Sequence, residues 1–500
     1  MRVPVSGGRN AWSTVATMRN GEVSYWWRAR GGSPPRRPSL PRPQEADVCI
    51  VGAGFTGLWT AYYLKGMRPA LRVVVLEATF AGYGASGRNG GWVTAALPGS
   101  RARYGRGPGG ADGVRALEAA LRSTVDEVGR VCAAEGIAAD FVKGGNVTVA
   151  TSPSQLARLR AGLAHDRKWG DGEDVVTFLT RDESRQRINV ADALGGLFTP
   201  HCARIQPAAL AEGLAASAER RGADIYEATP VTAILPAGGS DGSGGSGAGA
   251  VARTPFGDVR AKSVLRCTEG FTAALPGARR ELLPMNSSMV VTEPLPDSAW
   301  QEIGWSGFET LGDAAHAYMY AQRTADGRIA LGGRGVPYRF GSATDKLGET
   351  SPETADALGE ILRRMFPAAA TAQLDHAWCG VLGVPRDWCA SVSYDAASGI
   401  GWAGGYSGHG VNASNLAGRT LAELVLGESS ELTSLPWVGH RSRGWEPEPA
   451  RWAGVHGLYA LYRLADRLET PEDAGSGSQA RVSVGRALGH IGDVISGIPH

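Results

Sequence analysis

A glycine loop between two apolar runs constrains this chain more than any other feature. The loop reads G-A-G-F-T-G at residues 52–57, directly after the apolar run 48–51. A helix-like segment at 58–65 and a second apolar run at 73–76 follow, and that run ends at Glu77. Strand, glycine loop, helix, strand and acid within about 30 residues predict one βαβ unit of a parallel sheet.

Each part of this loop suits the binding of a dinucleotide. A glycine at position 52 permits the tight turn, one at 54 lets the backbone approach a pyrophosphate, and one at 57 lets the helix pack on the strand. The helix start offers free N–H groups to phosphates, and Glu77 can accept hydrogen bonds from a ribose hydroxyl. The residues that we assign to the dinucleotide here are Gly52, Gly54, Phe55, Thr56, Gly57, Glu77 and Ala78.

The composition argues against several other classes of protein. The 51 basic and 49 acidic side chains give a net charge of +2, which does not favour binding to nucleic acid or to a membrane surface. No secretory pattern and no apolar stretch of about 18 residues is present, so we expect a cytoplasmic protein. The six cysteines form no C-x-x-C pair and the nine histidines are scattered, so we expect no metal site.

Periodicity predicts the coarse organisation of the rest of the chain. Apolar residues at spacings of three and four predict an amphipathic helix over 114–132. Further helices are expected at 210–219 and 415–426, and strands at 225–227, 231–235, 251–254, 258–266, on both sides of a D-G turn within 318–334, and at 401–405. The low-complexity segment 237–250 is expected to be a flexible hairpin tip.

Two terminal segments leave alternatives open. Residues 1–46 are rich in Arg, Pro and Gly and carry Y-W-W at 25–27, which can anchor the segment on the body or belong to a partly disordered arm. Residues 436–500 contain tryptophans and an apolar stripe at helical spacing. That extension can pack on the body or serve a partner protein.

The segment after Glu77 separates FAD from NAD. It reads G-Y-G-A-S-G-R-N-G-G at 82–91 and resembles the D-amino-acid oxidase-like FAD-dependent oxidoreductases, a family that includes glycine, sarcosine and γ-glutamylputrescine oxidases. The string 84–91 is most similar to the γ-glutamylputrescine oxidase branch. The resemblance implies FAD contacts for Ser86, Arg88, Asn89, Gly90 and Gly91. Arg88 and Asn89 can alternatively only satisfy carbonyl groups of the loop.

Two further segments resemble the same family. G-G-Y-S-G-H-G-V-N at 404–412 is similar to a turn whose N–H groups face the flavin, and Asn412 stands where sarcosine oxidases carry lysine. T-P-V-T at 229–232 and T-E-G at 268–270 resemble the strands on the adenine side. The cofactor contacts implied by these matches are Gly405, Gly408, His409, Gly410, Val411, Asn412, Val231, Thr268 and Gly270.

The resemblance also implies the architecture and a non-covalent cofactor. It implies an α/β fold in which a Rossmann-like FAD-binding domain is interleaved with an α+β substrate domain on a mixed or antiparallel sheet. The glycine-rich segment 84–94 contains no Cys or His for covalent attachment, and no attachment motif surrounds Cys379 or Cys389. The expected division is an extension at 1–46, FAD-binding parts at 47–110, 200–284 and 377–435, substrate parts at 111–199 and 285–376, and a helical extension at 436–500.

The reaction implied by the resemblance is oxidation of a C–N bond. A hydride would pass from the carbon beside a neutral amine to flavin N5, the imine would hydrolyse, and O2 or another acceptor would reoxidise the flavin. The candidate active-site residues are Tyr318, Tyr320, Trp378 and His409, with His409 as a flavin contact or structural residue rather than a base. Gln322 lies on the same strand face as the tyrosines, and Arg204 and Arg334 are possible anion ligands.

One departure from the family bears on the substrate. Amino-acid oxidases commonly carry an arginine for the substrate carboxylate after the W-x-G run, whereas here 381–385 reads V-L-G-V-P and Arg386 follows. This favours a small-molecule amine without an α-carboxylate. The alternatives are an oxidase of amino acids or N-methyl amino acids and a flavin-binding protein that serves a partner. The sequence does not predict the oligomeric state.

Overall fold

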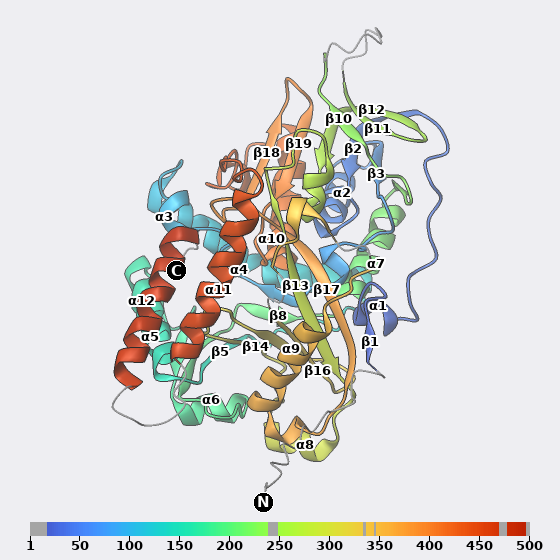
Figure 1. The fold of residues 1–500 in the computed structure, drawn as a ribbon. Coiled ribbons are helices and arrows are strands. Elements are labelled where there is room, and N and C mark those ends of the chain that lie inside the picture. The colour runs from blue at the N-terminus through green and yellow to red at the C-terminus, as the bar shows by residue number, and fades with distance from the viewer. Residues whose placement is uncertain (1–17, 239–248, 334–336, 345–346, 470–477, 497–500) are drawn as a thin grey trace, which may run out of the picture.

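The computed structural model describes residues 18–238, 249–333, 337–344, 347–469 and 478–496 (Figure 1). Two large sheets dominate these residues. The described helices contain no apolar stretch that is long enough to span a bilayer. The tip expected at 237–250 lies mostly outside the described residues, as does Arg334.

The first sheet grows from the predicted βαβ unit. Its central strands pair in parallel in the order β12-β2-β3-β9, and β10 and β11 extend the β12 side as antiparallel strands. β19 also pairs in parallel with β12 and carries β18. The strands are β2 (Gln44–Val51), β3 (Val73–Leu76), β9 (Ala223–Tyr226), β10 (Ala233–Leu235), β11 (Ala250–Thr254), β12 (Gly257–Arg266), β18 (Ser391–Asp395) and β19 (Ile400–Gly404).

Four helices pack in the core of this half. They are α2 (Phe55–Met67), α4 (Gly110–Glu135), α7 (Pro207–Arg220) and α10 (Gly410–Leu426). The stripe predicted for α4 is buried, with Val114, Leu117 and Leu121 fully inaccessible to solvent. α10 begins five residues before the predicted helix, because the positive φ of Ser407 and Gly408 turns the chain directly into it.

The second sheet has nine strands, in the order β1-β17-β13-β16-β15-β14-β5-β7-β6, and its pairs are antiparallel except β1–β17 and β14–β5. The strands are β1 (Arg19–Asn20), β5 (Asn146–Ala150), β6 (Thr177–Leu179), β7 (Gly195–Thr199), β13 (Leu283–Thr292), β14 (Thr310–Asp313), β15 (Tyr320–Arg323), β16 (Ile329–Gly333) and β17 (Leu374–Val384). Its helices are α5 (Pro153–Trp169), α6 (Arg181–Arg187), α8 (Asp297–Ile303) and α9 (Pro352–Met365). Together the two sheets confirm the expected α/β fold class.

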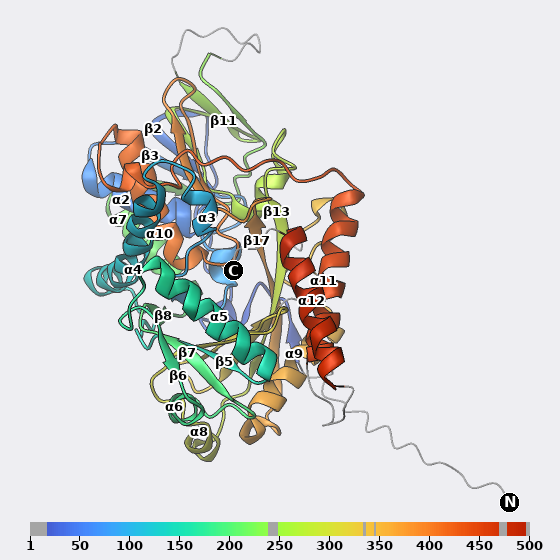
Figure 2. The same cartoon turned by 90° about the vertical axis from the view of Figure 1, so that its left-hand side faces the viewer.

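Smaller elements complete the body. A short ribbon pairs β4 (Trp92–Thr94) with β8 (Cys202–Arg204), and α3 (Arg101–Tyr104) precedes α4. The C-terminal helices α11 (Ala450–Glu469) and α12 (Ser478–Ser496) form an antiparallel pair beside α5 in both views (Figures 1 and 2). α11 packs on the body, since Val455 and Tyr459 belong to a buried cluster with Trp388.

The N-terminal aromatic cluster is buried in the body. Tyr25, Trp26 and Trp27 form the short helix α1 (Tyr25–Arg28) and are at most 3% exposed. The ring of Trp27 packs edge-on against Phe80 at 5.2 Å. A Cβ on Gly87 would lie only 2.3 Å from the Trp27 Nε1, so this tryptophan directly supports the glycine-rich 82–91 segment.

Substitution Trp27→Ala should lower the free energy of unfolding by about 3–5 kcal/mol, because it leaves a large cavity beneath the 82–91 segment. Urea denaturation of the two proteins measures the difference. Trp452→Ala is the matched control, since that tryptophan on α11 is 39% exposed and should cost less than about 1 kcal/mol. Equal losses for both variants would contradict the supporting role of Trp27.

Candidate functional site

The starts of two helices border one cavity between the two sheets. Phe55 and Thr56 of α2 line one side, and residues 408–411 at the start of α10 line another. The 85–90 segment, β15 and β17 complete the walls of a solvent-connected space of about 1110 Å³, which we call the inner cavity. The positive ends of both helix dipoles favour a ligand with electron-rich groups at both places.

The glycines of the first loop are required by close backbone contacts. Gly52 has a φ of +103°, and a Cβ there would lie 2.7 Å from the carbonyl oxygen of Cys267. A Cβ on Gly57 would lie 2.0 Å from the carbonyl oxygen of Gly52. At Gly54 a Cβ would meet only the Ser86 Oγ, at 3.1 Å. The loop therefore leaves its backbone open at the position expected for a pyrophosphate.

Glu77 lies at the end of β3 and faces this loop. Its carboxylate accepts hydrogen bonds from the backbone N–H groups of Ala53 at 2.8 Å and Thr79 at 2.9 Å. Burial raises the pKa of Glu77, although these N–H groups oppose the shift. Ala78 beside it is exposed. The Glu77 carbonyl accepts from Thr229 N, which places the segment before Val231 next to Glu77.

Two predicted residues at the end of β12 occupy different surroundings. Thr268 lies beside the loop, since its Cα would be 3.7 Å from a Cβ on Gly52. Gly270 is buried against β17, where a Cβ would lie 2.9 Å from Val381 Cγ1. Gly270 therefore permits the close approach of the short 3₁₀ helix at Glu269–Ala274 to β17, and its own atoms do not line the inner cavity.

Arg88 and Asn89 bond to carbonyl groups, as the alternative interpretation of these residues expects. Arg88 is 2% exposed, and it donates to the carbonyl oxygens of Tyr83 at 2.8 Å and Cys379 at 3.4 Å. Asn89 donates to the carbonyls of Ala85 and Ser86 and accepts from Gly91 N. Both residues also border the inner cavity, so they fix the shape of its wall.

β15 approaches the same segment from the second sheet. A Cβ on Gly90 would lie 2.7 Å from the Tyr320 ring, and a Cβ on Gly91 would lie 2.0 Å from Gln322 Nε2. Gln322 donates to the carbonyl oxygens of Gly90 and Ile205. Glycine at 90 and 91 is therefore explained by contact with the second sheet, and Gln322 is a support of the segment.

The predicted turn before α10 reaches the cavity in part. Gly408, His409, Gly410 and Val411 line it, whereas Gly405 and Asn412 do not. The Asn412 side chain is fully buried and donates to the Leu121 carbonyl of α4 at 2.8 Å. Asn412 therefore fastens α10 to α4 and directs no donor at the cavity.

Glu269 lines the inner cavity and was missed by the sequence analysis. Its carboxylate accepts from the N–H groups of Gly383 at 2.7 Å, Gly405 at 2.8 Å and Tyr406 at 3.0 Å. Burial raises its pKa to about 7, although the three N–H groups oppose the shift. The only signal in the sequence was its place between two selected residues, Thr268 and Gly270.

The candidate active-site residues divide into two groups. Tyr318, Tyr320 and His409 line the inner cavity, and Tyr320 Oη lies 2.8 Å from Ser287 Oγ. Trp378 is fully buried and does not line it; its Nε1 donates to the Arg88 carbonyl. Trp378 is thus placed to hold the 82–91 segment from behind.

Neither Arg204, a predicted anion ligand, nor Arg386 lines the inner cavity, and Arg334 lies outside the described residues. The Arg204 guanidinium lies 4.7 Å from the Phe308 ring centroid, and burial lowers the pKa of Arg204. Arg386 pairs with Glu446 at 3.1 Å and lies over Trp445. Among the described residues that line the inner cavity, Arg88 is the one arginine or lysine, and its guanidinium bonds to carbonyls.

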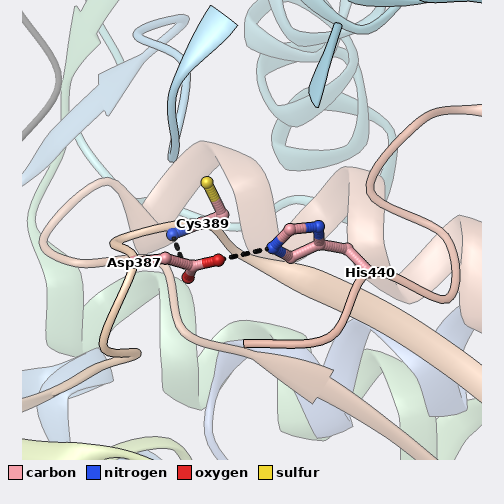
Figure 3. Close-up of side chains that lie close together, drawn as sticks. All are labelled: Asp387, Cys389 and His440. Atoms are coloured by element: carbon pink, nitrogen blue, oxygen red, sulfur yellow. Dashed lines mark hydrogen bonds and ion pairs between the residues drawn. The ribbon is translucent and has the colours of Figure 1, made fainter. Parts of the chain in front are cut away.

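Two clusters bring possible metal ligands within 4.8 Å of one another in the described chain. In the first, His440 Nε2 lies 2.8 Å from Asp387 Oδ2, and Asp387 Oδ1 accepts from Cys389 N (Figure 3). The Cys389 sulfur points away from this pair, and burial raises the pKa of Cys389 to about 12. These contacts fasten the segment around Trp388. The second cluster, His316, Asp466 and Glu469, joins α11 to the loop before β15.

The residues around the inner cavity fit FAD. Two helix starts suit the pyrophosphate and the electron-rich edge of a flavin, and the glycine segments leave backbone accessible between them. A carboxylate at the end of β3 suits the ribose. Ser86, Tyr320 and the start of α10 would then surround the cofactor along one continuous path.

Comparison with known proteins agrees with this fit. Residues 47–424 match the family described as FAD dependent oxidoreductase, DAO, and the chain belongs to this family. It is 28% identical to γ-glutamylputrescine oxidoreductase of Escherichia coli over 440 residues, which cover 84% of this chain and 93% of that protein. A probable oxidoreductase OrdL of Rhizobium meliloti is 29% identical over 434 residues, covering 82% and 90%.

Solved structures share the fold. Glycine oxidase from Geobacillus kaustophilus superposes with a TM-score of 0.65 at 22% identity, covering 80% of this chain and 100% of that one. Iminodiacetate oxidase from Chelativorans gives 0.61 at 19% identity, covering 78% and 99%. The predicted family and the FAD cofactor are thereby confirmed, and the chain is an FAD-dependent oxidoreductase.

Substitution Glu269→Gln should remove a pH dependence of stability. Between the ordinary pKa of 4.5 and about 7, the folded chain keeps a proton on Glu269 that the unfolded chain has released. The wild-type protein should therefore lose roughly 3 kcal/mol relative to the variant as pH rises through this window. Urea denaturation at several pH values with equal FAD measures this; a constant difference across the window would refute it.

Proposed function

We propose that this oxidoreductase oxidises the C–N bond of an amine that lacks an α-carboxylate, using non-covalently bound FAD. The observation that carries the proposal is the lining of the inner cavity. Hydroxyl and aromatic groups of Trp92, Ser287, Tyr318 and Tyr320 face it, whereas the guanidinium of Arg88 is bonded to carbonyls. Among the residues that the structure describes, a carboxylate buried there would have no cationic partner, which is costly.

The names of relatives support the same substrate class. One relative is a γ-glutamylputrescine oxidoreductase, whose name refers to an amine substrate, and structural neighbours include a glycine oxidase. The name of the glycine oxidase makes an amino acid the competing substrate. Arg386 is the first arginine after the segment where amino-acid oxidases commonly carry their ligand for the substrate carboxylate. Because Arg386 pairs with Glu446, we favour the amine over the amino acid.

Bound FAD would supply a hydride acceptor, and the chain's residues would prepare the substrate. The Tyr320 and Ser287 hydroxyls can hydrogen-bond an amine nitrogen and hold it in the neutral form that the reaction requires. N–H groups at the start of α10 favour negative charge in a ligand at that end of the cavity. Glu269 holds the turn before α10 and would fix the direction of those groups.

The remaining parts of the proposal follow the family pattern. We expect O2 to be the electron acceptor. The first sheet would be the centre of the FAD-binding domain, for which we expect 47–110, 200–284 and 377–435. These bounds do not follow the two halves everywhere, because α4 packs in the core of the first half and β17 pairs within the second sheet. The second sheet would be the substrate domain, built from 111–199 and 285–376. We expect the flavin to be bound non-covalently, because the segment 84–94 contains no cysteine or histidine to which it could be attached.

An anaerobic absorbance scan tests the proposal. Purified protein should be yellow, and its band near roughly 450 nm, a general flavin property, should bleach with primary amines and recover when O2 is admitted. Glycine, sarcosine and D- and L-amino acids form the matched panel, and they should bleach it far more slowly. Bleaching by amino acids and not by amines would refute the proposed substrate class, and a flavin that no compound bleaches would refute the activity.

A further inference from the structure

A second, larger cavity joins the inner one. Its empty space, open solvent included, is about 2390 Å³, and we call it the outer cavity. The residues that line both cavities are Trp92, Thr94, Tyr318, Ser407 and His409. Tyr318 is 38% exposed at this junction. The two cavities therefore adjoin at Tyr318.

One wall of the outer cavity lies outside the family match. Tyr459 and Tyr462 of α11 line it, whereas the match ends at residue 424. The superposition with glycine oxidase of Geobacillus kaustophilus uses 80% of this chain and all of that protein. The shared fold therefore does not need the remaining residues of this chain. Residues of α4 and α5 also line the outer cavity, and α5 lies alongside α11 and α12 (Figure 2).

Several aromatic side chains line the outer cavity. They include Trp92, Trp169, Trp388, Tyr459 and Tyr462. The faces of such rings attract cations, with an attraction of about 0.5–2 kcal/mol that increases as water is removed. The outer cavity therefore suits a positively charged group better than an uncharged polar one.

The charges in the same cavity favour a cation as well. Its described lining holds three carboxylates, Glu118, Asp166 and Asp171, against two guanidiniums, Arg101 and Arg122. Arg101 donates to all three carboxylates, at 2.6, 2.8 and 2.5 Å. Arg122 also lies 3.7 Å from Asp171, so both arginines are paired within this cluster, and its five side-chain charges sum to −1.

α11 also positions the residue at the junction. The N–H groups of His316 and Ala317, just before Tyr318, donate to the Asp466 carboxylate at 2.9 Å. His316 Nε2 lies 3.2 Å from Glu469 Oε1, and the His316 ring stacks on Tyr462 at 5.6 Å. The loop that carries Tyr318 is therefore held in position by α11.

We propose that the outer cavity is a second substrate subsite, which binds a distal cationic group of an extended amine, and that α11 determines this specificity through the aromatic ring of Tyr459. This inference rests on the proposed function, because the reacting amine would lie in the inner cavity. The preferred substrate is then a molecule with two positive groups separated by a flexible chain, one for each cavity.

Titration of the holoenzyme with octylamine and with α,ω-diaminooctane tests the proposal. The two compounds share one chain length and differ in the distal ammonium group. The anaerobic change in flavin absorbance gives a Kd even where no bleaching follows. Wild-type protein should bind the diamine more tightly, and Tyr459→Leu should weaken diamine binding roughly tenfold with little change for octylamine.

Two variants separate this effect from loss of folding. Tyr459→Phe keeps the aromatic ring and should retain the preference for the diamine, whereas Trp452→Leu changes an exposed residue two turns earlier on α11 that does not line the outer cavity, and it should change neither Kd. Equal binding of the two amines by wild-type protein, or equal losses for both in Tyr459→Leu, would overturn the subsite. Tight diamine binding without bleaching by any amine would refute the proposed activity and leave the subsite supported.

Discussion

The close packing of the 82–91 segment between the two sheets is the constraint on which the rest of the site depends. Trp27 contacts it from the N-terminal helix at Gly87, and Tyr320 contacts it from the second sheet at Gly90. Trp378 donates to the Arg88 carbonyl from behind. Since the first sheet supplies the other wall of the inner cavity, this one segment sets the spacing at which the two halves meet.

The electrostatic character of the site comes from backbone groups more than from charged side chains. Arg88 is bonded to carbonyls, and Glu269 is bonded to three N–H groups. What remains directed at the inner cavity is the start of α2 and the start of α10. Backbone dipoles do not titrate, so this part of the field stays constant where the protonation of Glu269 changes.

Local patterns predicted the βαβ unit and the two glycine-rich turns, because each is a contiguous motif with its own chemistry. Contacts between distant segments could not be predicted from such patterns. Glu269 meets residues 383 and 405, and Asn412 turns toward Leu121 of α4. Trp378 was selected for its motif, yet its neighbours place it behind the wall. Asp466 of α11 accepts from His316 and Ala317, about 150 residues earlier, and no local spacing reveals such a contact.

The pairing of β1 with β17 has a consequence for biogenesis. Arg19 pairs with His376 and Asn20 with Ala377, so a strand near the start of the chain joins one made more than 350 residues later. The same N-terminal part of the chain carries Trp27, which packs against the 82–91 segment. Because loops of this length close only after both ends exist, the nascent chain cannot finish its cofactor site during early synthesis. Flavin loading therefore belongs to the stage after most of the polypeptide has left the ribosome.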